Sequence, residues 1–297
     1  MQNVDADIRD AHSAGLPAAL APAAGDRLGL LSLRETLVAS VVANVGTLGR
    51  TLRSAVEATV IASVDLIRGR FLWRETLTQA WFLIKVTALP GVLMAIPFGV
   101  TVSVQVGNMV DQLGADSLIG AAGGLGVIKQ GAPLATGLLL GGAGAAAVAA
   151  DLGARTIREE VDAMRVMGID PRQRLVAPRI AAVLLVAPLL NVLIIVMGVV
   201  AGYLVAIAAL GVTPGSYWES FGAFTGGADV WVSLGKSMIF GYLVVSIACQ
   251  RGLEAKGGPR GVADGVNASV ILSVVTIAVV NAAITQVAAM FLPTELA

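Results

Sequence analysis

Residues 151–179, DLGARTIREEVDAMRVMGIDPRQRLVAPR, are the most charged segment of a chain that is otherwise mostly apolar. The segment contains six arginines and five acidic residues. Long runs without a charge border it on both sides, over about 131–150 and 180–210. A charged segment between two such runs is typical of a loop that joins two membrane-spanning helices.

The charged segment carries signals for both ends of a short helix. Thr156 and Glu159 have the spacing of a capping box, which predicts that a helix begins there. Gly168 suits the left-handed position just after a helix, and Pro171 cannot continue one. We therefore expect a helix over about 157–167, which would be about 16 Å long at 1.5 Å per residue.

The composition places the chain among membrane proteins. Of its 297 residues, 56% are hydrophobic and only 13% are charged, whereas soluble domains carry about 25% charged residues. The formal net charge is zero, so nothing global indicates a nucleic-acid partner. The single cysteine, Cys249, excludes an internal disulfide, and we expect it to be an apolar filler. The single histidine, His12, gives no basis for a histidine-based metal or catalytic cluster.

Five apolar runs are long enough to cross a bilayer as helices, which takes about 20 residues each. We expect these spans at about 86–108, 128–150, 180–210, 230–249 and 266–292. The loops on one side, 151–179 and 250–264, together hold nine Lys and Arg residues. The loops on the other side, 109–127 and 211–229, hold none. The positive-inside rule therefore places the N-terminus and the charged segment in the cytoplasm and the C-terminus outside. The predicted fold class is an all-α integral membrane protein with five transmembrane helices.

The residues before the first span divide into two predicted parts. Residues 1–32 lack a sustained period, and we expect a disordered cytoplasmic tail. Over residues 33–85, apolar side chains recur at helical spacing while charges interrupt any span, which predicts amphipathic and interfacial helices. Trp73 and Trp81 lie among basic residues and indicate an anchor at the membrane surface.

The predicted short helix offers a surface on which another protein could dock. Helical spacing gives two neighbouring faces, one with Glu159, Asp162, Ala163 and Val166 and the other with Glu160, Met164 and Met167. An acidic stripe beside methionines suits a groove on a soluble partner. The alternative is a solvated loop whose acids only pair with its own arginines, and spacing alone leaves both open.

Nothing in the sequence predicts an enzyme. Glu159 and Glu160 are adjacent, so they point in different directions and cannot act on one reacting atom. The chain contains no Walker A, HExxH or GxSxG motif, and no metal site is predicted. Any energy source must therefore come from another subunit.

The run REEVDAMRVMGIDPRQRLVAPR at residues 158–179 resembles the signature of the MlaE/YrbE permease family. Its most specific part is EEVDA at 159–163 followed by MGIDP at 167–171. Members of this family are the membrane subunits of ABC transporters that work with MCE-domain lipid-binding proteins. The similarity extends from about Arg74 to the end of the chain, and the Ala-, Gly- and Val-rich spans resemble actinobacterial YrbE proteins.

The resemblance implies a function and a set of partners. The short helix would be a coupling helix in a groove of a cytoplasmic ATPase dimer, which binds the ATP and Mg, so this chain holds no cofactor. The residues implied in that contact are Glu159, Glu160, Asp162, Ala163, Met164, Arg165, Met167 and Gly168. The resemblance further implies a plasma-membrane permease that pairs with a second protomer, identical or different. It would move lipids such as fatty acids, sterols or phospholipids to or from MCE-domain proteins outside.

Three polar residues near the outer ends of the spans are candidates for a substrate cavity or head-group contact, namely Lys129, Gln130 and Lys236. Family members often have an Arg-Glu pair where this chain has Lys129-Gln130, and an arginine where it has Ala143. Head-group contacts of relatives therefore do not transfer directly to this chain. The alternative for both lysines is that they extend their amines to the membrane surface.

Two other functions stay open beside the lipid permease. One is a permease of a small-solute ABC importer, whose outer loops would meet a soluble binding protein. The other is a non-transporting scaffold or channel, in which the acids of the short helix would have no partner groove. At the inner end of the second span, we expect Asp151 to face water or to pair with Arg155.

Overall fold

The structure, a computed structural model, describes three stretches of the chain, residues 56–57, 72–112 and 118–291. The chain divides into two compact units, Met1–Arg50 and Thr51–Ala297. All described residues belong to the second unit. The predicted tail at 1–32 and most of the predicted amphipathic segment at 33–85 lie outside the described residues.

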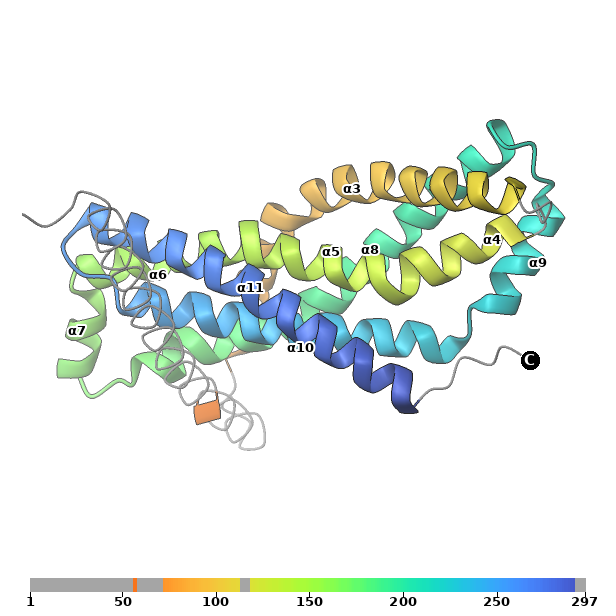
Figure 1. Ribbon diagram of the computed structural model, residues 1–297. Helices are drawn as coiled ribbons and strands as arrows, with labels where there is room; N and C mark the ends of the chain where they lie inside the picture. The colour runs from red at the N-terminus through yellow and green to blue at the C-terminus, as the bar shows by residue number, and fades with distance from the viewer. Residues whose placement is uncertain (1–55, 58–71, 113–117, 292–297) are drawn as a thin grey trace, which may run out of the picture. The chain divides into compact units, whose positions relative to one another are not determined.

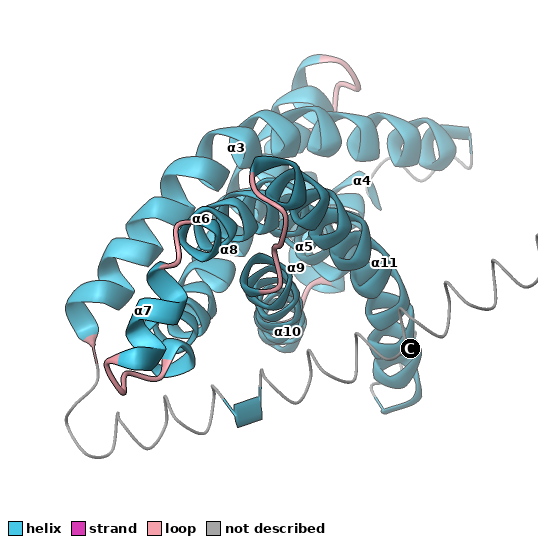
Figure 2. Ribbon diagram, turned by 90° about the vertical axis from the view of Figure 1, so that its left-hand side faces the viewer, coloured by secondary structure: helices cyan, strands magenta, loops and turns pink. Residues whose placement is uncertain are grey.

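All regular secondary structure in the described part of the chain is helical (Figures 1 and 2). Five helical runs are long and apolar enough to cross a membrane: Trp73–Val110, Ile119–Ile157, Arg172–Ala208, Gly227–Leu253 and Pro259–Ala288. The predicted all-α membrane protein with five spans is therefore confirmed. Each run is longer than predicted, because the helices continue into polar turns that a hydropathy criterion leaves out.

The five runs are built from ten α-helical or π-helical pieces. The first is α3 (Trp73–Gln112), and the fourth and fifth are α10 (Gly227–Leu253) and α11 (Pro259–Phe291). The second contains α4 (Ile119–Ala122), α5 (Ala132–Leu139) and α6 (Ala145–Ile157), joined by π-helical Gly123–Gly131 and Leu140–Gly144. The third begins with π-helical Arg172–Val176 and continues as α8 (Ala177–Ala208). Two short helices connect runs, α7 (Glu160–Val166) and α9 (Pro214–Phe224).

Helix α3 differs from the prediction of an interfacial helix followed by a span that begins at residue 86. It is one helix of 40 residues, and Trp73 and Trp81 are exposed near its start. The Lys85 ammonium lies 5.3 Å from the centroid of the Trp81 ring. Charged residues in the first turns lower the hydropathy without interrupting the helix, so the predicted interfacial helix and the first span form one continuous helix.

The outer loop predicted at 211–229 contains helix α9. Thr213 precedes this helix, and its hydroxyl oxygen accepts a hydrogen bond from the Ser216 N–H at 3.4 Å. Pro214 occupies the first helical position, where its missing N–H costs nothing. Tyr217 is fully buried in a small apolar cluster with Ile119 and other residues. Burial, with Tyr203 nearby, raises the pKa of Tyr217 to about 12, so its phenol is neutral at physiological pH.

Glycines let the long helices approach closely. A Cβ atom on Gly99 of α3 would lie 2.1 Å from the carbonyl oxygen of Gly198 on α8. A Cβ atom on Gly252 of α10 would lie 2.7 Å from the Leu152 side chain and 3.0 Å from the Ala149 carbonyl oxygen on α6. Small residues permit such backbone contact between membrane helices. Helices α6, α8 and α10 contribute most of the main core, whereas α11 leaves most of its apolar surface exposed.

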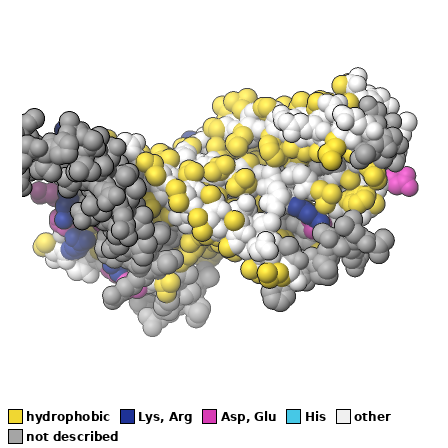
Figure 3. Space-filling view, in the orientation of Figure 1, with side chains coloured by type: hydrophobic (Ala, Val, Ile, Leu, Met, Phe, Trp, Pro, Cys, Tyr) yellow, Lys and Arg dark blue, Asp and Glu magenta, His cyan; other side chains and the backbone are white. Residues whose placement is uncertain are grey.

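The distribution of side chains on the surface agrees with a membrane-spanning bundle. Hydrophobic side chains cover much of the face of the long helices seen in Figure 3, and most described charged side chains gather toward its two ends. Helix α7 lies at one end of the bundle and α9 at the other (Figure 1). We call these the α7 end and the α9 end.

Candidate functional site

The helix predicted over 157–167 is shorter in the structure and begins later. Helix α6 continues to Ile157, and α7 runs only from Glu160 to Val166. Thr156 is therefore inside α6, where its hydroxyl lies 2.9 Å from the Leu152 carbonyl oxygen and 3.2 Å from that of Gly252. The predicted capping box is wrong, because the preceding span uses the threonine for its own last turn. The chain turns instead at Glu159, whose φ is 60°.

The end of α7 follows the prediction. Gly168 has a φ of 75°, and its N–H donates to the Arg165 carbonyl oxygen at 3.0 Å. The Ile169 N–H donates to the Met164 carbonyl oxygen at 2.9 Å. This pair of bonds is a Schellman motif, which satisfies the carbonyls of the last turn.

Helix α7 has one side against the core and one side in solvent. Val161 is 2% exposed, and Met164 packs on the same core cluster. Val166 is 90% exposed and Met167 is 65% exposed. The prediction placed Met164 and Met167 on one face, but the structure turns Met164 inward as an anchor. A fixed helix that exposes apolar side chains at a loop is suited to contact another protein.

The charged residues around α7 pair with one another. Arg158 and Glu160 approach to 3.1 Å, and Arg165 and Asp162 to 2.8 Å. This is the pairing that the solvated-loop alternative predicts. Exposed pairs of this kind contribute only about 0–1 kcal/mol each, so a partner can rearrange them at little cost. They also leave Val166 uncovered.

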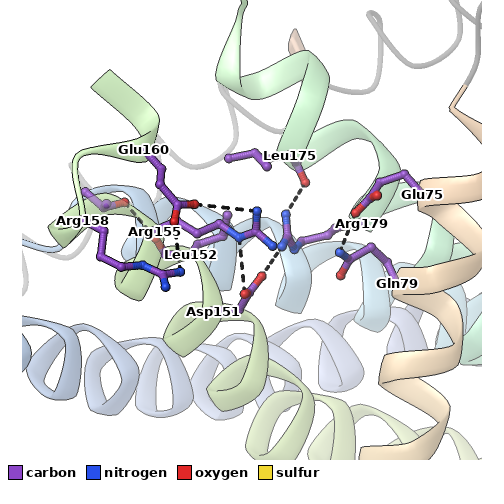
Figure 4. Close-up of polar contacts among 10 residues, drawn as sticks. Glu75, Gln79, Asp151, Leu152, Arg155, Arg158, Glu160, Leu175 and Arg179 are labelled. Atoms are coloured by element: carbon purple, nitrogen blue, oxygen red, sulfur yellow. Dashed lines mark hydrogen bonds and ion pairs between the residues drawn. The ribbon is translucent and has the colours of Figure 1, made fainter. Parts of the chain in front are cut away.

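An ion-pair cluster connects α6, which precedes α7, to α8, which follows it. Asp151 accepts a hydrogen bond from Arg155 Nε at 3.4 Å, as the pairing alternative predicted. Arg179, which was not among the predicted site residues, is 2% exposed and donates to the other carboxylate oxygen of Asp151. Arg179 also donates to the Leu175 carbonyl oxygen at 2.6 Å. Figure 4 shows Arg155 and Arg179 converging on the Asp151 carboxylate.

A pocket of about 300 Å³ lies at the same end of the bundle. Its lining comes from the end of α7, the turn that follows, and the end of α10: Arg165, Asp170, Pro171, Arg172, Gln250, Leu253 and Glu254. Several of its charges are already engaged, since Asp170 accepts the Arg172 N–H at 2.9 Å and the Arg172 side chain pairs with Glu57. The pocket therefore presents no single sign of charge.

A polar cluster near the α9 end brings together the three residues proposed for the substrate cavity. The Lys129 amine pairs with Asp229 at 3.2 Å. The Lys236 amine donates to Thr285 Oγ1 at 3.1 Å, and the Gln130 amide lies 3.4 Å from the same oxygen. Lys236 also reaches the Lys129 carbonyl oxygen at 3.5 Å. These side chains come from α10, α11 and the π-helical Gly123–Gly131.

The two lysines of this cluster have different environments. Lys236 is only 4% exposed, so it points into the bundle and not to the membrane surface. No carboxylate lies within ion-pair distance of Lys236 among the residues that the structure describes. Asp229 has other partners, because its carboxylate accepts a hydrogen bond from the Gly226 N–H at 3.0 Å and forms an ion pair with Lys129. The cluster thus holds one buried positive charge whose partners are neutral. Within the described ranges, no group of three or more His, Cys, Asp and Glu side chains could hold a metal ion.

Comparison with known proteins identifies the family to which this chain belongs. The sequence model of the family described as Permease MlaE matches residues 76–287. A probable ABC transporter permease protein of Synechocystis sp. is 29% identical over 218 residues, covering 73% of this chain and 83% of that protein. A probable ABC transporter permease protein of Rickettsia typhi is 30% identical over 200 residues, covering 67% and 77%. The intermembrane phospholipid transport system permease protein MlaE of Haemophilus influenzae is 27% identical over 158 residues, covering 53% and 60%.

The matched residues include α7, the Asp151 cluster and the Lys236 cluster, so the two polar sites lie within the shared region. The five apolar helical runs have the length that membrane spans require, as expected for a relative of permeases. The chain therefore belongs to the MlaE family of multi-pass ABC transporter permeases.

Proposed function

We propose that this chain is the permease subunit of an MCE-type ABC transporter that moves lipids across or out of the plasma membrane. A separate cytoplasmic ATPase drives it, and MCE-domain proteins outside receive or deliver the lipid. The name of the Haemophilus influenzae relative, a phospholipid transport permease, supports lipid as the substrate class. The observation that carries the proposal is helix α7, which is anchored to the core by Val161 and exposes Val166.

Helix α7 is the contact for the ATPase in this proposal. Glu160, Asp162, Ala163, Arg165 and Met167 contribute the contact surface, together with Val166. Glu159 and Gly168 set the two ends of the helix through their positive φ angles, and Met164 holds the helix on the core. ATP and Mg are bound by the ATPase. The α7 end is then cytoplasmic, which agrees with the concentration of arginines around it.

The lipid passes between two permease protomers in this proposal. Helices α3 and α11 leave most of their apolar surface uncovered within one chain, which is the surface that lipid or a second protomer can cover. Lys129, Gln130 and Lys236 lie near the α9 end, where a head group would enter or leave. The buried Lys236 ammonium, which has only neutral partners in the described chain, suits an anionic head group.

Charge reversal on α7 tests the proposal. Glu160→Arg combined with Asp162→Arg should abolish co-purification of the ATPase and ATP-dependent lipid movement, while membrane insertion persists. Asp264→Arg is the matched control, because Asp264 is also an exposed acid, but it lies in the first turns of α11. Unchanged lipid movement in the α7 variant would contradict the proposal. Insertion without any ATPase partner in the wild type would favour the scaffold or channel alternative.

A further inference from the structure

The ion pair between Asp151 and Arg179 joins the two ends of the segment that contains α7. Asp151 lies on α6 before α7, and Arg179 lies on α8 after it. Arg179 donates directly to Asp151, so two positions that are 28 apart in the sequence, one on each side of α7, meet at one contact. Whatever force acts on α7 must therefore enter the two spans beside this contact.

Arg179 depends on Asp151 for its charge balance. The arginine is 2% exposed, and Asp151 is the acid that pairs with it in the described chain. Its Nε has no hydrogen-bond partner among the described residues, and Nη1 donates to the neutral Leu175 carbonyl oxygen. A buried charge held by one carboxylate has a strong preference for one arrangement, because separation would leave it unpaired. The pair is thus well suited to fix α8 against α6.

A second connection holds α6 to α10 at the same level. The Thr156 hydroxyl lies 3.2 Å from the Gly252 carbonyl oxygen. Gly252 has no room for a side chain, because a Cβ atom there would lie 2.7 Å from the Leu152 side chain. The ends of α6, α8 and α10 are therefore joined by polar contacts and close packing directly beside α7, and Val161 of α7 is buried against them.

We propose that Asp151 and Arg179 are positioning residues that lock the start of α8 to α6, so that movement of α7 shifts both spans as one body. This inference rests on the proposed function, in which the ATPase moves α7. Removal of the pair would let α7 move with α6 or with α8 alone. The ATPase would then still dock and hydrolyse ATP, but fewer lipid molecules would move for each ATP.

The test uses the complete transporter, with its ATPase and MCE partners, in phospholipid vesicles. The measured quantity is the number of lipid molecules moved per ATP hydrolysed. Asp151→Asn and Arg179→Gln should each lower this ratio about tenfold, within the range of typical coupling between distant sites, while ATP hydrolysis stays near the wild-type rate. Asp151→Glu keeps the charge and should restore most of the ratio.

Matched controls separate this role from a general effect of charge removal. Arg174→Gln removes an exposed arginine from the same segment, and Asp264→Asn removes an exposed acid from α11. Both should keep the wild-type ratio. If Asp151→Asn or Arg179→Gln fails to accumulate, Arg179→Lys decides, because lysine keeps the charge but lacks the planar fork that reaches Asp151 and Leu175 together. We expect Arg179→Lys to have a lower ratio than Arg174→Gln.

The outcomes distinguish the two proposals. A ratio in the Asp151 and Arg179 variants equal to that of the controls, with a wild type that moves lipid, overturns the positioning role alone. A parallel loss of ATP hydrolysis and lipid movement also overturns it, because that result indicates a structural role. A wild-type complex that hydrolyses ATP and moves no lipid overturns the proposed function and the positioning role with it.

Discussion

Val161 and Val166 lie on the same short helix α7, yet Val161 is 2% exposed and Val166 is 90% exposed. The contrast separates an anchoring side chain from a contact side chain within one helix. Val161→Ala removes buried methyl groups and should lower the free energy of unfolding by about 2 kcal/mol. Thermal unfolding of the purified permease in detergent measures this loss.

Val166→Asp should have the opposite pattern. An exposed position tolerates the change within about 0.5 kcal/mol of folding free energy. The ATPase should bind at least about fivefold more weakly, because loss of an interface side chain that matters costs about 1 kcal/mol or more. Titration of the ATPase onto permease in detergent or nanodiscs gives the Kd. Equal Kd values for wild type and Val166→Asp would show that this side of α7 does not contact the ATPase.

The close approach of α3 and α8 gives a further prediction. Gly99→Ala would place a methyl group 2.1 Å from the Gly198 carbonyl oxygen, so the helices must move apart. Overpacking of this kind costs about 1–3 kcal/mol. The matched control is Gly142→Ala, because a Cβ atom at Gly142 has nothing within 4 Å. Alanine there should be neutral or stabilise by about 0.5–1 kcal/mol, since glycine is a poor helix former.

The comparison is made by thermal unfolding of both variants in the same detergent. A Gly99→Ala protein as stable as wild type would mean that α3 and α8 do not touch at these glycines. A large loss in Gly142→Ala would mean that something covers Gly142 in the assembled protein.

The sequence predicts the spans well because a bilayer selects for one property, the length of an apolar run. Five such runs are present, and five helices in the structure match them. It also predicts how α7 ends, because a left-handed glycine such as Gly168 is a local signal. Local signals fail where tertiary structure competes for the same group. Thr156 resembles a cap but bonds within α6 and to α10.

The candidate sites show the same division. The sequence placed Lys129, Gln130 and Lys236 near one membrane surface, but it could not show that Lys236 turns inward to Thr285. Arg179 was visible only as the last charge before an apolar run. Its burial depends on the packing of α8 against α3 and α10, and the Asp151 carboxylate of α6 then lies within reach. A charge at the matching depth of the neighbouring span is the signal that could have identified this pair.

Lys236 gives a prediction about the substrate. Lys236→Met keeps the volume of the side chain and removes the buried charge, so the fold should be as stable or more stable. Retention of anionic lipid during purification should fall about tenfold, because a hydrogen bond to a charged group contributes about 1.5–3 kcal/mol. Lipid that co-purifies with the permease is quantified by mass spectrometry. Lys256→Met is the control, since Lys256 is an exposed lysine between α10 and α11. Equal retention of anionic lipid by both variants would show that Lys236 does not contact the head group.

The orientation of the bundle is open to a direct test. The positive-inside rule places the turn with Lys256 in the cytoplasm and α9 with Glu219 outside. The parent variant is Cys249→Ala, which removes the single, buried cysteine. Glu219→Cys and Lys256→Cys are then introduced separately, and both positions are exposed in the structure.

A membrane-impermeant maleimide should label Glu219→Cys in intact cells, because an exposed thiol outside the membrane is within its reach. Lys256→Cys should be labelled only after the membrane is permeabilised. The parent variant should not be labelled in either condition, which shows that the signal comes from the new thiol. Labelling of Lys256→Cys in intact cells would show that the bundle has the opposite orientation in the membrane. Helix α7 would then lie outside the cell, where an ATPase that uses cytoplasmic ATP could not dock on it, and the role proposed for Val166 would fail together with the orientation.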